Sequence, residues 1–486
     1  MRFSILHISD LHQDLRDEIP NTWLLDSLAR DIERFSTSDP AILRPSVCIV
    51  SGDIVYGISG TAPNSATELT RQYTLAHDFL VELCDKFFDG DRDRVVILPG
   101  NHDVDYSQVI ASGAFVPVPA APEEKRRLVS ELFSPNSNLR WTWGRIEFFR
   151  IDDTTKYNNR LKSFADMYER FYLGRRTYPL DPQTQYDIFD YPSLGLSVVA
   201  LNSCHNNDPM NRAGSINPTA MAAAYRQIRN PSRSGWVIAA TWHHNFAGGL
   251  FHEDFLDPGF LQLLIEGGAS LGFHGHQHRS DCFDERYKLG DKPRKITIVS
   301  AGTLCAEPKG LSPGVPRSYN VVELDTEAWR GKVHLRQMVN QMQSMPVWGP
   351  GLFVDTNASF MNFDLSRPVS SRPPNLDVEL ALERASDFLG KAQWTDVLIE
   401  LKNHHNHPMA RRMLVRSLQE LRDDRLTIET LREPQSLEES VLVGGAILES
   451  GTLIEIKQFL SLSYIVQSAD ASIGHIVTRL QRRLAT

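Results

Sequence analysis

Short apolar runs that end abruptly in polar side chains recur along the first part of the chain. The first three are Arg2–Ser9, Val47–Val50 and Val95–Leu98, and all are rich in β-branched or other large apolar residues. Such runs are typical of buried strands. Pro99-Gly100 stops the third run sharply, because proline lacks a ladder donor and glycine permits unusual backbone dihedrals. The pattern predicts strands that carry polar clusters at their carboxyl ends, where open sheets place their sites.

Two helices are predicted between these strands. The first covers about Asn21–Phe35. The second covers Ser65–Phe88, with one apolar stripe formed by Leu69, Tyr73, Ala76, Phe79, Leu80 and Leu83. The resulting order of strand, helix, strand, helix, strand is typical of a layered α/β domain with helices packed on a sheet.

The following part of the chain is less regular before strands resume. Residues 106–191 contain proline-rich and aromatic-rich stretches, and we expect an insertion beside or over the carboxyl edge of the sheet. Further strands are predicted at Ser197–Leu201, Trp236–Thr241 and Ser270–Phe273. The last predicted strands lie near Lys295–Ser300, Ser318–Leu324 and Lys332–Arg336. No helix is predicted between them, so we expect them to pair antiparallel at the edge of the sheet.

The composition indicates three regions. A first domain is expected over residues 1–342, and a linker or extended strap rich in Pro, Gly, Ser and Asn over residues 343–375. Residues 376–486 have helical spacing and few strand signals, which predicts a small helical bundle. Asn403–His407 is rich in histidine, but Pro408 follows it, so an interhelical loop is favoured over a metal site.

Composition and charge exclude several protein classes. The chain has 486 residues, of which 41% are hydrophobic and 23% charged, as in an ordinary soluble protein. Its net charge of −9 gives no sign of a strongly basic nucleic-acid surface. Five scattered cysteines without a CxxC pair favour free thiols in a reducing compartment. No apolar run is long enough to span a bilayer, and Met1–Ser9 is too short for a signal peptide, so we expect a cytoplasmic protein without membrane partners.

Seven potential metal ligands follow predicted strands and are therefore expected at one edge of one sheet: Asp10, His12, Asp53, Asn101, His243, His276 and His278. Nitrogen and oxygen ligands without a thiolate suit two divalent ions such as Mn²⁺, Fe²⁺ or Zn²⁺, and do not suit a cysteine-type structural zinc site. The Asp-x-His and His-x-His spacings matter because alternate residues of an extended segment can face the same way.

Each of these residues has an ordinary structural explanation when taken alone. A single histidine is more often a hydrogen-bonded core residue than a ligand, and His7 in the first strand fits that description. Arg175-Arg176 could clamp a phosphate or form a solvated turn, and the sequence leaves both open. The seven ligands together, in order and each after a strand, favour the metal site.

The motifs resemble those of the calcineurin-like metallophosphoesterase superfamily, in particular its bacterial cyclic-nucleotide phosphodiesterase branch. They are Asp10-Leu11-His12, Gly52-Asp53, Gly100-Asn101-His102-Asp103, His243-His244 and Gly275-His276-Gln277-His278, and they cover about residues 1–340. The resemblance implies a four-layer α/β/β/α sandwich with a di-metal centre, to which the C-terminal all-α domain is an addition.

The resemblance also implies roles for individual residues. Asp10, His12 and His278 would hold one ion, Asn101, His243 and His276 the other, and Asp53 would bridge both. Of the pair His243-His244, the first matches the family's ligand, but the sequence leaves open which one binds. Two such ions would acidify a water molecule toward hydroxide, which attacks phosphorus in line.

His102 is the predicted catalytic residue, which stabilises the transition state or protonates the leaving oxygen. Asp103 either orients His102 or closes the turn, and we favour the turn. The Gly residues of the motifs are expected to let the backbone approach the metals closely.

The predicted function is therefore that of a di-metal-dependent phosphohydrolase. We expect Mn²⁺ as the metal, and as the substrate a phosphodiester such as a nucleotide or a nucleic acid. A DNA nuclease of the repair-exonuclease type is one alternative, weakened because Tyr56 stands where that branch carries histidine. A non-catalytic scaffold acting through the helical domain is the other. We expect residues 376–486 to mediate self-association or to bind a protein partner, with stabilisation of the first domain as the alternative.

Overall fold

The computed structural model describes most of the chain. The described residues are 1–486 except 15–18, 59–63, 135–136, 246–255, 257–258, 290–291, 307–309, 312–313, 341–344, 355, 368–375, 469 and 486. Arg372-Pro373-Pro374 of the predicted linker lies outside them. The chain divides into two compact units, Met1–Val369 and Ser370–Thr486, which we describe separately.

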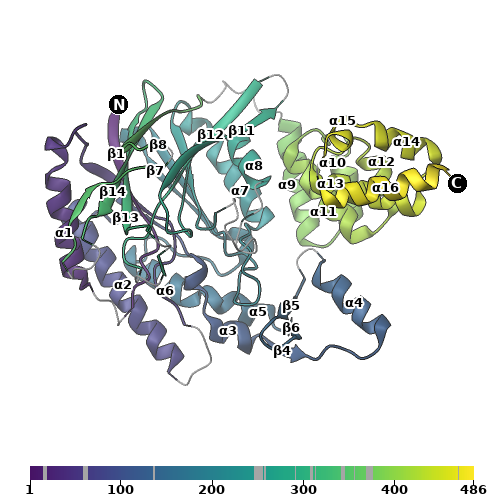
Figure 1. The fold of residues 1–486 in the computed structure, drawn as a ribbon, viewed down its shortest axis with the longest axis horizontal. Coiled ribbons are helices and arrows are strands. Elements are labelled where there is room, and N and C mark those ends of the chain that lie inside the picture. Colours follow the sequence, from purple (N-terminus) through teal and green to yellow (C-terminus); the bar gives the residue numbers. More distant parts are fainter. Residues whose placement is uncertain are drawn as a thin grey trace. The chain divides into compact units, whose positions relative to one another are not determined.

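The first unit is built on two large sheets (Figure 1). One has seven strands, in the order β15 (Trp348–Pro350), β14 (Arg330–Met338), β13 (Ser318–Asp325), β1 (Arg2–Ile8), β2 (Pro45–Val50) and β3 (Val95–Ile97), with β16 (Phe360–Asp364) also paired to β14. Strand β1 runs parallel to β2 and antiparallel to β13. The first strand of the chain is therefore an inner strand of this sheet.

The second sheet has six strands, in the order β11 (Asp281–Leu289), β12 (Lys292–Ser300), β10 (Ala269–His274), β9 (Val237–Thr241), β8 (Leu196–Leu201) and β7 (Tyr186–Tyr191). Its inner strands are parallel, and β7 and β11 pair antiparallel at its two edges. The antiparallel pairing predicted for the last strands is thus present, but it is divided between the two sheets.

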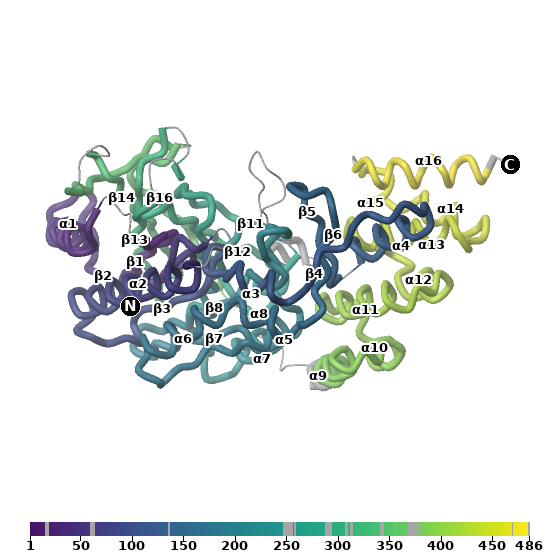
Figure 2. The backbone as a smooth tube through the Cα atoms, turned by 90° about the horizontal axis from the view of Figure 1, so that it is seen from below, coloured from purple at the N-terminus to yellow at the C-terminus, as the bar shows by residue number. Residues whose placement is uncertain are grey.

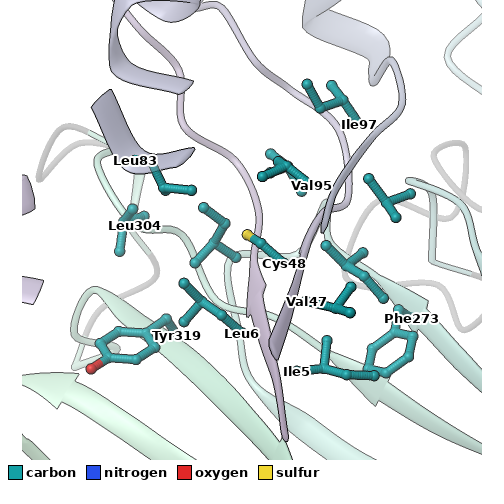
Figure 3. Close-up of a cluster of buried hydrophobic side chains, with 14 of the residues drawn as sticks. Ile5, Leu6, Val47, Cys48, Leu83, Val95, Ile97, Phe273, Leu304 and Tyr319 are labelled. Carbon is teal, nitrogen blue, oxygen red and sulfur yellow. The ribbon is translucent and has the colours of Figure 1, made fainter. Parts of the chain in front are cut away.

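The two sheets pack face to face and are covered by helices. The rings of His7 on β1 and Phe273 on β10 lie 4.9 Å apart, and Figure 3 shows Ile5 and Val47 beside Phe273. The helices α1 (Asn21–Glu33) and α2 (Ser65–Phe87) pack on the first sheet's side, whereas α7 (Pro218–Ile228) and α8 (Gly259–Gly267) pack on the second sheet (Figure 2). Strand β1 is buried from Phe3 to Ile8 because both of its faces are covered. The predicted α/β sandwich is confirmed.

The region 106–191 divides into two structural parts. The first contains a small three-stranded sheet, β4 (Gly113–Val116), β6 (Glu147–Ile151) and β5 (Leu139–Thr142), with the helices α3 (Tyr106–Ala111), α4 (Pro122–Leu132) and α5 (Thr154–Asn158). The second part belongs to the main core: α6 (Lys162–Phe171) packs against α2, and the Tyr172 hydroxyl donates to the Val95 carbonyl at 2.5 Å. Several of its aromatic residues therefore extend the core, and Tyr178 packs both on the core and on the cluster that contains Val104 and Cys204.

Two strands lie within residues 343–375, where the sequence predicted none. Both β15 and β16 pair with β14 at the edge of the first sheet. Proline, glycine and asparagine interrupt the apolar alternation in this stretch, which hides such short edge strands from pattern analysis.

The second unit is all helical in its described residues, as predicted. Its helices are α9 (Leu376–Gly390), α10 (Trp394–Leu401), α11 (Pro408–Leu421), α12 (Asp424–Thr430), α13 (Leu437–Ser450), α14 (Leu453–Ser461), α15 (Ser463–Val466) and α16 (Ala471–Ala485). The loop containing Asn403–His407 joins α10 to α11, as expected. The short α12 and α15 were not predicted, because a few residues show no helical period. Nowhere in the described chain is a helix both long and apolar enough to cross a bilayer.

Candidate metal centre

The seven predicted ligands and His102 lie together, and they come from two sheets rather than one. Asp10 and His12 follow β1, Asp53 follows β2, and Asn101 and His102 form the turn after β3. His243 follows β9, and His276 and His278 follow β10 of the other sheet. The prediction of a single sheet edge was wrong because strand ends reveal which residues reach an edge, not how many sheets meet there. The cluster lies where the carboxyl ends of both sheets meet.

The backbone at these strand ends is left-handed, which corrects a second expectation. Asp10, His12 and Asp53 have φ of 52°, 45° and 51°, and His276 and His278 have φ of 75° and 54°. The Asp-x-His and His-x-His residues therefore do not share an extended segment. A left-handed backbone conformation is energetically costly for residues other than glycine, and such strain concentrates at functional sites. Hydrogen bonds between loops hold them, such as those from the amides of Asp10 and His12 to the carbonyls of Gly52 and Asp53, at 3.1 and 3.0 Å.

The glycines of the motifs make room for the ligand side chains. A Cβ on Gly52 would lie 2.4 Å from His243 Nδ1, and one on Gly100 would lie 2.2 Å from Asp53 Oδ1. A Cβ on Gly275 would lie 2.5 Å from Asp10 Oδ2. None of these three buried neighbours can move away without disturbing the cluster, so these positions require glycine.

The first group of potential ligands contains Asp10, His12 and His278. The Nε2 atoms of His12 and His278 lie 3.0 Å apart, and Asp10 Oδ1 lies 3.3 Å from His278 Nε2. Asp10 Oδ1 is buried and makes no hydrogen bond to the described residues. His278 Nδ1 donates to the Gly310 carbonyl at 2.6 Å, which leaves Nε2 as the nitrogen that faces the group. These three atoms converge as ligands of one cation do.

The second group contains Asn101, His243 and His276. Asn101 Oδ1 lies 3.0 Å from His243 Nε2 and 2.9 Å from His276 Nδ1. His243 Nδ1 donates to the Ser51 carbonyl at 2.8 Å, so its Nε2 is the nitrogen available to the group.

Asp53 lies between the two groups. Its Oδ2 is 3.2 Å from His243 Nε2 in one group and 3.8 Å from His12 Nε2 in the other. Its Oδ1 accepts the His102 amide at 2.8 Å. Three overlapping sets of Asp and His side chains have ligand atoms within 4.8 Å of one another, and Asp10, His12 and Asp53 each belong to two of them. Anionic oxygens and imidazole nitrogens at this spacing fit divalent cations.

His243 and His244 have different surroundings. His244 is buried with both ring nitrogens engaged, Nδ1 at 2.9 Å from Ser203 Oγ and Nε2 at 3.2 Å from Asn207 Nδ2. Its ring packs beside His276 at a centroid distance of 4.9 Å. The geometry thus favours His243 as the ligand and His244 as a residue that supports the cluster from behind.

The pKa values of the histidines in the cluster differ with the distance of each ring from the two carboxylates. Burial lowers the pKa of His12 to about 3 and that of His276 to about 4, so both keep a lone pair at neutral pH. Burial opposes charge on His243 and His278 too, but the Asp53 and Asp10 carboxylates outweigh it and raise the pKa of each to about 9. Burial favours the neutral forms of the Asp53 and Asp10 carboxyl groups. His243 and His278 outweigh it and hold the pKa of both carboxyl groups below the usual range. Both carboxylates are therefore ionised.

Asp103 closes the turn and does not orient His102. Its Oδ2 accepts the amides of Gly100 and Ile54 at 2.8 and 3.1 Å, and its Oδ1 accepts the Tyr73 hydroxyl at 3.0 Å. The interpretation of Asp103 as a turn residue is confirmed. His102 instead donates from Nδ1 to the Tyr56 carbonyl at 2.6 Å.

The remaining candidates have structural roles. Arg176 pairs with Asp93 and Asp187 at 3.0 and 2.9 Å, and Arg175 pairs with Asp93 at 3.0 Å, so both guanidinium groups are engaged within the fold. His7 is buried, with Nε2 at 3.0 Å from Ser51 Oγ. The phosphate clamp considered for Arg175-Arg176 therefore finds no support in their contacts.

Sequence reasoning missed the groups that orient the histidines. Three of them are backbone carbonyls, those of Ser51, Tyr56 and Gly310, and a carbonyl leaves no mark on the sequence. Ser203 was also missed, although its hydroxyl accepts the amides of both His243 and His244 at 3.1 Å. It follows a predicted strand, which was the signal that could have identified it.

Comparison with known proteins identifies a family model that covers the region containing this cluster. The family model for calcineurin-like phosphoesterases matches residues 3–280. No curated protein sequence matches the chain. The solved structure of GAP50, the anchor in the inner membrane complex of Plasmodium, is 9% identical, with a TM-score of 0.35, over 78% of this chain and 94% of its own. The calcineurin-like phosphoesterase YfkN from Bacillus subtilis is 10% identical, with a TM-score of 0.27, over 84% of this chain and 99% of its own.

The family match spans more than half of the chain and contains every motif of the metal cluster. The chain therefore belongs to the calcineurin-like phosphoesterase family.

Proposed function

We propose that this chain is a di-metal-dependent phosphodiesterase that acts on nucleotides or nucleic acid, with residues 1–342 as its catalytic domain. The observation that supports the proposal best is the convergence of two ligand groups on Asp53. A buried carboxylate oxygen of Asp10 without a described hydrogen bond, next to two imidazole nitrogens 3.0 Å apart, is an arrangement that a cation would stabilise.

We propose the division of the ligands that the sequence motifs imply, and the contacts within the cluster support it. Asp10, His12 and His278 would hold one ion, and Asn101, His243 and His276 the other, with Asp53 between them. Mn²⁺ is the metal we propose, because mixed carboxylate, amide and imidazole ligands suit it, and Fe²⁺ and Zn²⁺ are the alternatives. Two bound divalent ions supply Lewis-acid activation of water and neutralise charge on phosphoryl oxygens.

The protein's own contribution to the reaction comes from His102. Its Nδ1 is engaged by the Tyr56 carbonyl, so Nε2 is the nitrogen left for substrate. When protonated, Nε2 donates to a phosphoryl oxygen or to the leaving oxygen. The ring lies 4.6 Å from that of His12, between centroids, which places it beside the ligand groups.

The preference for diesters rests on charge. A monoester is a dianion at neutral pH and needs more positive charge than a diester. No run of Lys or Arg flanks the site motifs in the sequence to supply it. We therefore expect diesters to be cleaved faster than monoesters.

A substrate panel tests the proposal. The full chain is loaded with Mn²⁺ and assayed against bis-p-nitrophenyl phosphate, p-nitrophenyl phosphate, cyclic nucleotides, and single- and double-stranded DNA. We expect the bis-ester and at least one nucleotide or nucleic-acid diester to be cleaved. Faster release of phosphate from p-nitrophenyl phosphate would reverse the diester assignment, and cleavage confined to DNA would identify a nuclease. No hydrolysis of any substrate would favour the scaffold alternative.

We also propose that the helical unit mediates self-association or binds a protein partner. Several large apolar side chains on its surface are more than half exposed: Ile399 at 62%, Leu453 at 58%, Ile454 at 68% and Val466 at 68%. Contact with a partner would remove such apolar side chains from water, which supports this proposal.

A further inference from the structure

The contact that orients His102 involves backbone rather than a second side chain. A carbonyl oxygen can only accept, so the bond of 2.6 Å to the Tyr56 carbonyl requires the proton of His102 to be on Nδ1. The tautomer and the direction of the ring thus depend on where the loop after β2 holds the Tyr56 peptide.

Gln72 of α2 holds that loop from behind. Its Oε1 accepts the Gly57 amide at 2.9 Å and its Nε2 donates to the Gly57 carbonyl at 3.2 Å. The side chain is 1% exposed. A primary amide is the side-chain group that offers an acceptor and a donor side by side, so it can satisfy both polar groups of one residue.

Gly57 fits closely against the turn that carries His102. It has φ of +79°, and a Cβ at this position would lie 2.5 Å from the His102 carbonyl oxygen. A small shift of Gly57 is therefore transmitted to His102 both through this contact and through the Tyr56 carbonyl.

The next residue of the same helix holds the other side of the contact. The Tyr73 hydroxyl donates to Asp103 Oδ1 at 3.0 Å, and Asp103 closes the turn that contains His102. Helix α2 thus holds the acceptor loop through Gln72 and the donor turn through Tyr73, with both side chains buried.

We propose that Gln72 is a positioning residue for catalysis, which sets the tautomer and orientation of His102 through Gly57 and the Tyr56 carbonyl. This inference rests on the catalytic role proposed for His102. The described hydrogen bonds of Gln72 go to Gly57 and not to a potential metal ligand, so its loss should change the rate of the chemical step and leave metal content and substrate affinity unchanged.

The kinetic test uses the Mn²⁺-loaded full chain and bis-p-nitrophenyl phosphate. Gln72→Met keeps the length of the side chain and removes both hydrogen bonds. We expect kcat to fall roughly 10- to 100-fold, the scale of a misplaced catalytic group, with KM within about twofold. Gln72→Glu keeps the acceptor for the Gly57 amide and should lose less. Ser27→Ala is the matched control, since it removes a buried hydroxyl that contacts Leu24 and Trp348, and it should leave kcat unchanged.

A double variant separates positioning from general loss of stability. In a His102→Ala background, Gln72→Met should cause no further loss of kcat. The same fractional loss with and without His102 would overturn the proposal, as would a folded Gln72→Met protein with the kcat of the unmodified chain. If His102→Ala alone has no effect, the proposed role of His102 fails, whatever Gln72 does.

A measurement without metal or substrate tests the link directly. Long-range ¹H–¹⁵N spectra of ¹⁵N-histidine-labelled, metal-free protein at about pH 8.5 report tautomers, because free histidine is neutral there. The His102 signals are assigned by their absence in His102→Ala. We expect the Nδ1–H form in the unmodified chain and a shift toward Nε2–H in Gln72→Met. An unchanged tautomer would contradict the proposal, and Gln72→Glu serves for both measurements if Gln72→Met does not fold.

Discussion

Left-handed backbone at five of the cluster's residues has an energetic cost of about 1–3 kcal/mol each. Asp10, His12, Asp53, His276 and His278 are held in it by the surrounding loops, and the glycines of the motifs let the side chains of Asp10, Asp53 and His243 pack closely. Rigid ligands of this kind present a preformed site, which lowers the ordering cost of binding a cation. The consequences can be tested one residue at a time.

His102 should be needed for turnover and not for metal binding. We expect His102→Ala to lower kcat by roughly 10²–10⁴, the usual scale for a general acid or an oxyanion donor, because Nε2 is the nitrogen left for substrate. Metal content, measured by elemental analysis, should stay at that of the unmodified chain. An unchanged kcat would mean that His102 only forms the turn, and a loss of metal would mean that it is a ligand.

Asp53 should control metal content. Its Oδ2 lies between the two ligand groups, so Asp53→Ala should lower the metal content measured by elemental analysis after Mn²⁺ loading from two ions to one or fewer per chain. Gly100→Ala is a matched test from outside the ligand set, because the added Cβ would lie 2.2 Å from Asp53 Oδ1 and displace it. Full metal content in both variants would contradict the assignment of Asp53 as the bridging ligand.

How far the sequence predicts this site differs from residue to residue. Asp10, His12, Asp53 and Asn101 could be identified because each follows a strand with a clear apolar run. The choice between His243 and His244 could not be made, because it depends on Ser51 and Ser203, which meet them only in three dimensions. The carbonyls of Tyr56 and Gly310 could not be predicted at all, since every residue has one.

At the scale of the elements, a buried ion pair ties α1 to the first sheet. Asp31 on α1 is fully buried and accepts from Arg336 on β14, at 2.5 and 2.8 Å, and from the Tyr319 hydroxyl on β13, at 2.5 Å. Arg336 is only 4% exposed, so it has no access to water if its partner is lost. This network ties α1 to β13 and β14, two strands that lie far from α1 in the sequence.

Asp31→Ala should therefore destabilise the first unit by about 3–5 kcal/mol, the usual cost of leaving a buried charge unpaired. Denaturant unfolding followed by tryptophan fluorescence measures the change. Asp26→Ala on the same helix is the control, because its pairing with Lys86 is at the surface and should contribute nothing measurable. Equal stability of the two variants would show that the buried pair does not hold α1.

The elements themselves were predictable where one strong pattern dominated. The apolar runs of β1, β2 and β3 and the stripe of α2 predicted those elements almost to the residue. Strands β15 and β16 were missed because pairing with β14, and not their own composition, makes them strands. The pairing of β1 with β13 has no local signal in the sequence either, since Arg2 and its partner Asp325 are neighbours in the sheet but lie far apart in the sequence.

At the scale of the whole molecule, the proposed chemistry belongs to the first unit and association to the second. We expect a fragment of residues 1–375 to keep its metals and its activity on bis-p-nitrophenyl phosphate, because every proposed ligand precedes residue 279. Light scattering should show a smaller assembly for the fragment than for the full chain. The same oligomeric state for both, with a fragment that is merely less stable, would favour the alternative that the helical unit only stabilises the first.

The pairing of β1 with β13 also determines when the protein can become complete during its synthesis. Strand β1 is made long before β13, so one of its two hydrogen-bonding edges stays open until β13 has been made. Pairings between such distant segments form slowly, and an open apolar edge favours aggregation while it waits. His243, His276 and His278 are made late as well, so a nascent chain lacks the three proposed ligands of the second sheet until β9 and β10 have been made. Metal binding at the proposed site would therefore require the finished first unit, and rapid overexpression is the condition under which chaperone supply should limit the yield.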